Sequence, residues 1–195
     1  MLLKKIIKAN LSKKNSFIKV EGISSDSRKV KKGDLFFALK GNKFDGNKFI
    51  SMAIKKGAKA TISSSNNIAK DNKIPVIKVR NIKENLLQAC LKFYDKKPKN
   101  IIAVTGTNGK SSVADFFRQI LLINKIPVSS IGTLGIKKNK KTKKLKLTSP
   151  DIISLHKELY ALKKSKIDNV IIEASSHGLD QNRLDNLNFK AGIFT

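Results

Sequence analysis

Residues 104–112 read VTGTNGKSS and stand between an apolar segment at 101–105 and an amphipathic segment at 110–123. This order of strand, glycine-containing loop and helix is typical of phosphate binding, because small residues let successive backbone N–H groups point at phosphate oxygens. The start of the helix adds its partial positive charge. We therefore expect ATP to bind at Gly106, Thr107, Asn108, Gly109, Lys110, Ser111 and Ser112.

Two side chains of this loop have expected roles. Lys110 would reach the β- and γ-phosphates, and the Ser111 hydroxyl would bind Mg²⁺ or phosphate. The general phosphate-loop pattern has a glycine where Val104 stands, so the match covers only the second half of that pattern. A glycine loop with a purely structural purpose is the alternative.

Downstream of the loop, apolar segments alternate with helical ones, which predicts a parallel sheet. We expect a helix at 151–165 and strands at 127–131, 169–174 and 189–195. His156, inside that helix, is expected to be partly exposed. Residues 137–146 hold seven lysines in ten positions and predict a solvated loop or hairpin tip.

A second α/β block precedes the loop and is separated from it by the linker-like segment 96–100. Within it, the segment 48–56 is expected to be a helix with Phe49, Met52 and Ala53 on one face. Cys90 falls on the apolar stripe of a helix that Asn81 would cap, which favours a core residue over a nucleophile. The expected strands are 17–20, 34–39, 58–62 and 75–79, and the second helix is 81–94.

Length and composition exclude several classes of protein. The 195 residues suffice for one ordinary domain or two small ones. One cysteine excludes an internal disulfide framework, and no Cys/His cluster suggests a zinc site. No apolar run reaches the length of a membrane span or signal peptide. We expect a soluble, cytoplasmic protein without a membrane partner.

The charge is strongly positive, with 41 Lys+Arg against 14 Asp+Glu and a formal net charge of +27. Such a charge suggests nucleic acid as a partner. However, only four of the cations are arginines, aromatic residues for base stacking are few, and the lysines are spread along the chain. We expect solvated lysine surfaces and no nucleic-acid partner. A basic nucleic-acid-binding protein with a vestigial nucleotide loop is the competing hypothesis.

Five stretches resemble the Mur ligase family. The loop TGTNGKS at 105–111 resembles the family's ATP-binding loop, and EASSHGLDQNR at 173–183 resembles the signature of its MurE type. The stretches SSDSR at 24–28, GDLFFALKG at 33–41 and FDG at 44–46 resemble the UDP-sugar-binding domain of family members. The resemblance implies a small amino-terminal UDP-binding α/β domain at 1–97. An incomplete P-loop-type parallel-sheet ATPase domain would follow at 98–195.

The resemblance also implies a reaction in peptidoglycan precursor synthesis. ATP would phosphorylate the D-Glu carboxylate of UDP-N-acetylmuramoyl-L-alanyl-D-glutamate, with Mg²⁺ as cofactor. The amine of a diamino acid, meso-diaminopimelate, would then attack the acyl phosphate. Lysine-adding and dipeptide-adding ligases of the family, or a generic P-loop kinase or NTPase, are the alternatives. Because the family is longer, the resemblance implies a fragment, expected to be monomeric, with little turnover by itself.

Family positions carry over to specific residues. Lys110 and Glu173 would be catalytic, and Ser111, Glu173 and His177 would bind the metal, with a structural turn histidine as the alternative for His177. In the UDP-sugar domain, Ser and turn residues suit uracil and ribose. In the ATP-binding domain, Arg183 offers a fork for a substrate carboxylate. The implied UDP-substrate contacts are Ser25, Ser27, Asn42, Lys43, Phe44, Thr148, Ser149, Ser175, Gln181 and Arg183.

Overall fold

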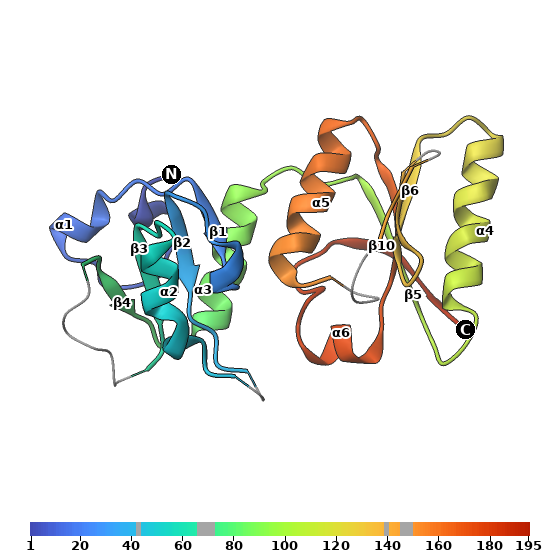
Figure 1. Cartoon of the computed structure of the whole chain (residues 1–195). Helices are drawn as coiled ribbons and strands as arrows, with labels where there is room; N and C mark the ends of the chain where they lie inside the picture. Colours follow the sequence, from blue (N-terminus) through green and yellow to red (C-terminus); the bar gives the residue numbers. More distant parts are fainter. Residues whose placement is uncertain (42–43, 66–72, 139–140, 145–149) are drawn as a thin grey trace. The chain divides into compact units, whose positions relative to one another are not determined.

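The computed structural model describes residues 1–41, 44–65, 73–138, 141–144 and 150–195. It divides into two units, residues 1–93 and residues 94–195, each with its own sheet (Figure 1). Among the described residues, no helix combines the length and the apolar character needed to cross a membrane.

The first unit is built on a four-stranded parallel sheet in the order β1-β2-β3-β4. Both central strands are buried along their whole length, as expected for a parallel sheet covered on both faces. The strands are β1 (Gly22–Ser24), β2 (Asp34–Phe37), β3 (Ala60–Ser63) and β4 (Val76–Lys78). The helices are α1 (Lys13–Ser16), α2 (Ile50–Lys55) and α3 (Ile82–Phe93), with 3₁₀ turns η1 (Leu3–Lys5), η2 (Ser27–Lys29) and η3 (Gly46–Phe49).

The strand expected at 17–20 is wrong. The side chain of Ser12 caps α1 by accepting a hydrogen bond from the Asn15 backbone N–H at 3.3 Å, and Phe17 ends that helix. Phe17 is 57% exposed, with the Lys4 ammonium 4.6 Å from its ring centroid. Only an isolated bridge joins Lys19 to Leu2. The local helix cap therefore overrides a short alternating pattern.

The two larger helices of this unit, α2 and α3, can be compared with the buried faces predicted for the helices at 48–56 and 81–94. In α2 the buried residues are Ile50 and Ala53, whereas Met52 is 43% exposed, because the 3₁₀ turn η3 has three residues per turn and shifts the helical phase. For α3 the prediction is confirmed, since the Glu84 backbone N–H donates to the Asn81 side chain at 3.1 Å. Cys90 is fully buried.

The second unit contains a six-stranded sheet in the order β10-β5-β9-β6-β7-β8. Its first four strands are parallel, which confirms the expected parallel sheet, and β7 and β8 extend it in antiparallel fashion. The described part of the lysine-rich segment is thus a hairpin. The strands are β5 (Asn100–Thr105), β6 (Val128–Gly132), β7 (Gly135–Lys138), β8 (Lys141–Lys143), β9 (Asn169–Glu173) and β10 (Phe189–Phe194).

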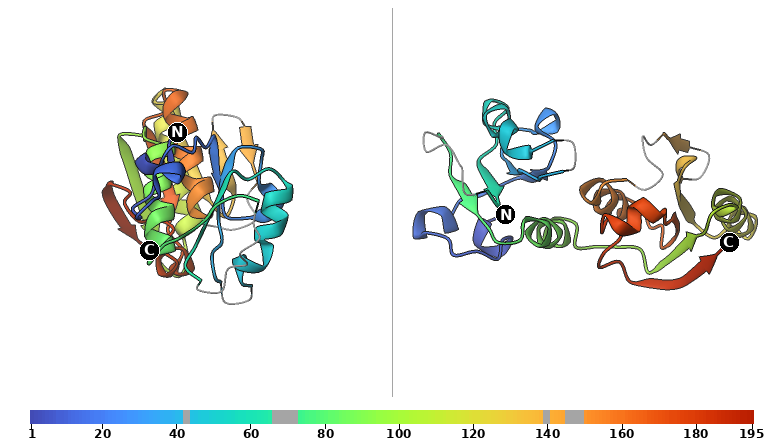
Figure 2. Two further views of the ribbon diagram at one scale, coloured as in Figure 1. Left: turned by 90° about the vertical axis from the view of Figure 1, so that its left-hand side faces the viewer. Right: turned by 90° about the horizontal axis from the view of Figure 1, so that it is seen from below.

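Helices cover both faces of this sheet. Figures 1 and 2 show α4 (Lys110–Ile123) on one side of the strands and α5 (Ile152–Lys164) on the other. Alternate residues of the strands divide between the two layers: Val104 and Ile171 pack with α4, and Ile101 and Ile172 with α5. The short helix α6 (Ser176–Asp180) follows β9. This arrangement brings the carboxyl ends of β5, β9 and β6 together at one edge.

His156 is fully buried, which corrects the expectation of partial exposure. It lies on the core-facing side of α5 with Leu155 and Leu159. Neither ring nitrogen has a hydrogen-bond partner within the described structure. Burial therefore lowers the pKa of His156 to about 4.

Candidate functional site

The loop between β5 and α4 has the backbone that phosphate binding needs. Gly106 and Gly109 have φ of 137° and 77°, in the region that favours glycine, and a Cβ on Gly106 would overlap the backbone of Thr195. Gly109 is the N-cap of α4, and no side chain caps the helix there. The first amides of a fourteen-residue helix therefore face the loop, together with its partial positive charge.

Lys110 lies folded over this loop. Its ammonium donates hydrogen bonds to the carbonyl oxygens of Gly106 at 2.6 Å and Thr107 at 3.1 Å. A flexible cation held over the loop amides is positioned to contact an anion that those amides bind. The geometry of these residues suits the expected ATP contact.

Glu173, the last residue of β9, provides the buried carboxylate of the site. It is 2% exposed, and its register partner on β5 is Val104, two residues before the glycine loop. The Ser111 hydroxyl donates to its Oε2 at 3.1 Å. The structure therefore brings together Ser111 and Glu173, which the sequence placed in separate elements, and Lys110 precedes Ser111 at the start of α4.

Thr133 is a member of this site that the sequence reasoning missed. It follows β6 directly, and its backbone N–H donates to Glu173 Oε1 at 3.1 Å while its hydroxyl donates to Oε2 at 2.9 Å. Thr195 was also missed: its backbone N–H donates to the Thr105 carbonyl at 2.9 Å, and its hydroxyl to Asn108. In the sequence, the mark of Thr133 is its position just after the strand expected at 127–131.

The site suits Mg²⁺ that arrives with a nucleotide. Mg²⁺ typically takes one or two carboxylates and completes its shell with waters and substrate phosphates. Over the described ranges, no group of three or more His, Cys, Asp or Glu side chains forms a self-sufficient metal site. The Glu173 carboxylate and the Ser111 hydroxyl, in hydrogen-bond contact beside a phosphate-binding loop, fit this smaller protein share.

The segment after β9 carries four more expected residues. The Ser175 hydroxyl accepts a hydrogen bond from the Gly178 backbone N–H at 3.1 Å and so caps α6. The Arg183 guanidinium donates through Nε to the Gln181 side-chain oxygen at 3.0 Å, so the half-buried Arg183 contacts the exposed Gln181. His177 belongs to α6, but its side chain lies outside the described part.

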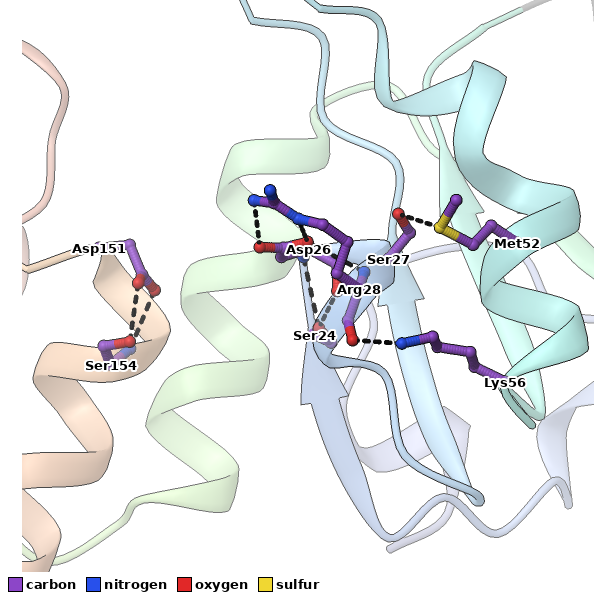
Figure 3. Close-up of polar contacts among 8 residues, drawn as sticks. All are labelled: Ser24, Asp26, Ser27, Arg28, Met52, Lys56, Asp151 and Ser154. Carbon is purple, nitrogen blue, oxygen red and sulfur yellow. Dashed lines mark hydrogen bonds and ion pairs between the residues drawn. The ribbon is translucent and has the colours of Figure 1, made fainter. Parts of the chain in front are cut away.

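In the first unit, the polar contacts around 24–28 lie within the turn and between the turn and the region of α2 (Figure 3). Asp26 accepts hydrogen bonds from the Arg28 backbone N–H and from its guanidinium at 2.9–3.0 Å, which lowers the pKa of Asp26. The buried Ser27 hydroxyl donates to the Met52 sulfur at 3.3 Å, and Lys56 donates to the Arg28 carbonyl. These contacts form a turn that is bonded to itself and to α2.

The remaining expected substrate contacts are only partly described. Ser25 is half-buried in the same turn, and Phe44 is 71% exposed. The other four lie outside the described residues: Asn42, Lys43, Thr148 and Ser149. Two residues after Ser149 in the sequence, Asp151 caps α5 by accepting hydrogen bonds from Ser154, also drawn in Figure 3.

Comparison with known proteins identifies relatives of both units. A model described as the Mur ligase middle domain matches residues 104–195, and one described as the Mur ligase family, catalytic domain, matches residues 19–94. A UDP-N-acetylmuramoyl-L-alanyl-D-glutamate--2,6-diaminopimelate ligase from Brucella melitensis biotype 1 is 43% identical over 91% of this chain. The protein of the same name from Bradyrhizobium diazoefficiens is 44% identical, also over 91% of this chain.

Solved structures agree with these matches. A structure of a UDP-N-acetylmuramoyl-L-alanyl-D-glutamate--2,6-diaminopimelate ligase superimposes with a TM-score of 0.78 over the whole chain, at 26% identity, and 40% of that protein is covered. MurF from Acinetobacter baumannii has the same fold over 84% of this chain, with a TM-score of 0.57, 22% identity and 32% of its own chain covered. The chain spans 36% of the length of each of the two curated relatives.

Proposed function

We propose a function from the premise that the chain belongs to the Mur ligase family. The chain would carry the ATP site and the UDP-sugar site of a ligase that adds meso-diaminopimelate to UDP-N-acetylmuramoyl-L-alanyl-D-glutamate. The observation that carries the proposal is the contact between Glu173 and Ser111. It places a buried carboxylate beside a phosphate-binding loop at the carboxyl edge of a parallel sheet. Ligands of open α/β folds bind at that edge.

The chain's own groups would act by positioning and charge. The loop amides and Lys110 would hold the β- and γ-phosphates of ATP, so that the terminal phosphorus faces the D-Glu carboxylate of the substrate. Ser111 and Glu173 would hold Mg²⁺, which when bound neutralises charge on the phosphates. His177 is the third metal ligand that we propose, and Arg183 would pair with a substrate carboxylate.

The UDP-muramoyl end of the substrate is assigned to Ser25, Ser27, Phe44, Ser175 and Gln181. This assignment rests on their match to family positions. Asn42, Lys43, Thr148 and Ser149 complete it. No residue of this chain is assigned to selecting the incoming diamino acid.

Thermal unfolding of the purified 195-residue chain tests the proposal. ATP with Mg²⁺ and UDP-N-acetylmuramoyl-L-alanyl-D-glutamate should each raise the melting temperature, because a ligand that binds only the folded state stabilises it. The gain is about 2.7 kcal/mol at a hundred times the dissociation constant. UDP-N-acetylglucosamine, which lacks the dipeptide, serves as the matched control and should stabilise less.

Other outcomes separate the competing functions. Stabilisation by ATP but not by the UDP-linked dipeptide would indicate a generic ATP-binding protein. Stabilisation by an oligonucleotide alone, lost steeply between two salt concentrations, would favour the basic nucleic-acid-binding protein, because phosphate contacts release counterions.

A further inference from the structure

Thr133 holds both oxygens of the Glu173 carboxylate. The backbone N–H reaches Oε1 at 3.1 Å, and the hydroxyl reaches Oε2 at 2.9 Å. The two donors come from one residue at the end of β6, the strand that pairs with β9 next to Glu173. Two bonds to two oxygens fix the rotation of a carboxylate, which a single bond does not.

The neighbouring residue makes this approach possible. A Cβ on Gly132 would overlap the Glu173 carboxylate, so only glycine lets the end of β6 come this close. Glu173 is 2% exposed, whereas Thr133 is exposed. The hydroxyl of an exposed residue is thus directed at a buried carboxylate, and its removal leaves no core cavity.

Ser111 and Thr133, which both donate to this carboxylate, would respond differently to a bound metal ion. Ser111 and Glu173 are both proposed ligands, so their contact with each other has to adjust when a cation enters between them. Thr133 is not needed as a ligand, and its two hydrogen bonds can persist. Outer-shell donors of this kind orient a ligating group and typically account for about 10- to 100-fold in metal affinity.

We infer that Thr133 is a positioning residue that fixes the Glu173 carboxylate for a divalent cation. This inference rests on the proposed ATP and metal site. It adds to that site a residue that takes part through Glu173 alone.

Binding of Mn²⁺ to the 195-residue chain in the presence of ATP, followed by electron paramagnetic resonance, tests the inference. Thr133→Val keeps the backbone N–H and the shape but removes the hydroxyl, and it should weaken apparent Mn²⁺ affinity about 10-fold or more. Thr133→Ser should restore it. Thr142→Val, on β8, is the matched control and should leave the Mn²⁺ affinity unchanged. In excess chelator, all variants should bind ATP with the same affinity as the wild-type chain.

The outcomes separate this inference from the proposed function. A wild-type chain that binds no Mn²⁺ with ATP would overturn the proposed site itself. Wild-type affinity in Thr133→Val, or failure of Thr133→Ser to recover, would overturn the positioning role while leaving the site intact. If Thr133→Val melts at a much lower temperature, Thr133→Ala gives the same comparison without a branched side chain.

Discussion

The carboxyl edge of the second sheet and the turn at 24–28 in the first unit are both polar, and they are built in opposite ways. At the sheet edge, Ser111, Thr133 and Glu173 come from segments separated by at least 22 residues and meet on one carboxylate. In the turn, Asp26 bonds Arg28, two residues away. A local motif satisfies its own hydrogen bonds, whereas convergence across strands produces a site.

The largest expected difference between the two units is in how their free energy of unfolding depends on pH. His156 is buried with a pKa of about 4, against 6.5 for an ordinary histidine, so the folded state disfavours its protonation. Stability is therefore complete above pH 6.5 and falls as the pH drops towards 4, by roughly 3 kcal/mol at 1.36 kcal/mol per pKa unit. Both histidines of the chain lie in the second unit, so the first should not share this loss.

Urea unfolding at a series of pH values measures this effect. The fluorescence of Tyr94 and Tyr160, the two tyrosines of the chain, follows the second unit. His156→Leu should flatten the pH dependence between 6.5 and 4, and His177→Gln should keep it. A slope that survives in His156→Leu would assign the acid response to another group.

Loss of ATP affinity should be the next largest effect, and it tests whether the two polar regions differ in function. Lys110→Ala removes an ammonium held over the phosphate loop and should weaken ATP binding about 30-fold, or roughly 2 kcal/mol for a charge-assisted hydrogen bond. Arg28→Ala, in the turn, should leave ATP affinity unchanged. Isothermal titration calorimetry gives both dissociation constants. Equal losses of ATP affinity in the two variants would show that the two polar regions do not differ in ATP binding.

The smallest expected effect is the loss of folding stability when an ion pair is removed. The comparison is between a pair that joins two elements and a pair inside a turn. Asp115 on α4 pairs with Lys137 of β7 at 2.9 Å and with Arg118 at 3.1 Å, and the Lys137 hydrogen bond is the main reason that the pKa of Asp115 falls to about 2. Asp115→Asn should cost about 1 kcal/mol, the upper range for partly exposed pairs.

Asp26→Asn should cost less, because the asparagine oxygen still caps η2. Denaturant midpoints monitored by circular dichroism compare the two. A larger loss in Asp26→Asn would show that the turn contributes more than its own hydrogen bonds suggest.

The parts of the fold that were predictable from sequence depend on short-range signals. The phosphate loop, the cap at Asn81, and the parallel strands follow from local residue patterns. Glu173 was predictable as the end of an apolar strand, with the family resemblance supplying its role.

Thr133 was not predictable in this way, because its contact depends on β6 lying beside β9, a pairing between segments about 40 residues apart. His156 was misjudged for a similar reason. Its polar character suggested exposure, whereas its position on α5, between Leu155 and Leu159, directs it into the core. Strand neighbours and helix phase are properties of the whole unit.

The buried position of Cys90 gives the protein a built-in chemical label. The chain has one thiol, fully buried in the first unit, and two phenol rings, both in the second. A thiol-modifying reagent therefore records only the opening of the first unit, while phenol emission records only the second. The order in which the two units open can therefore be measured on the natural sequence, without substituting any residue.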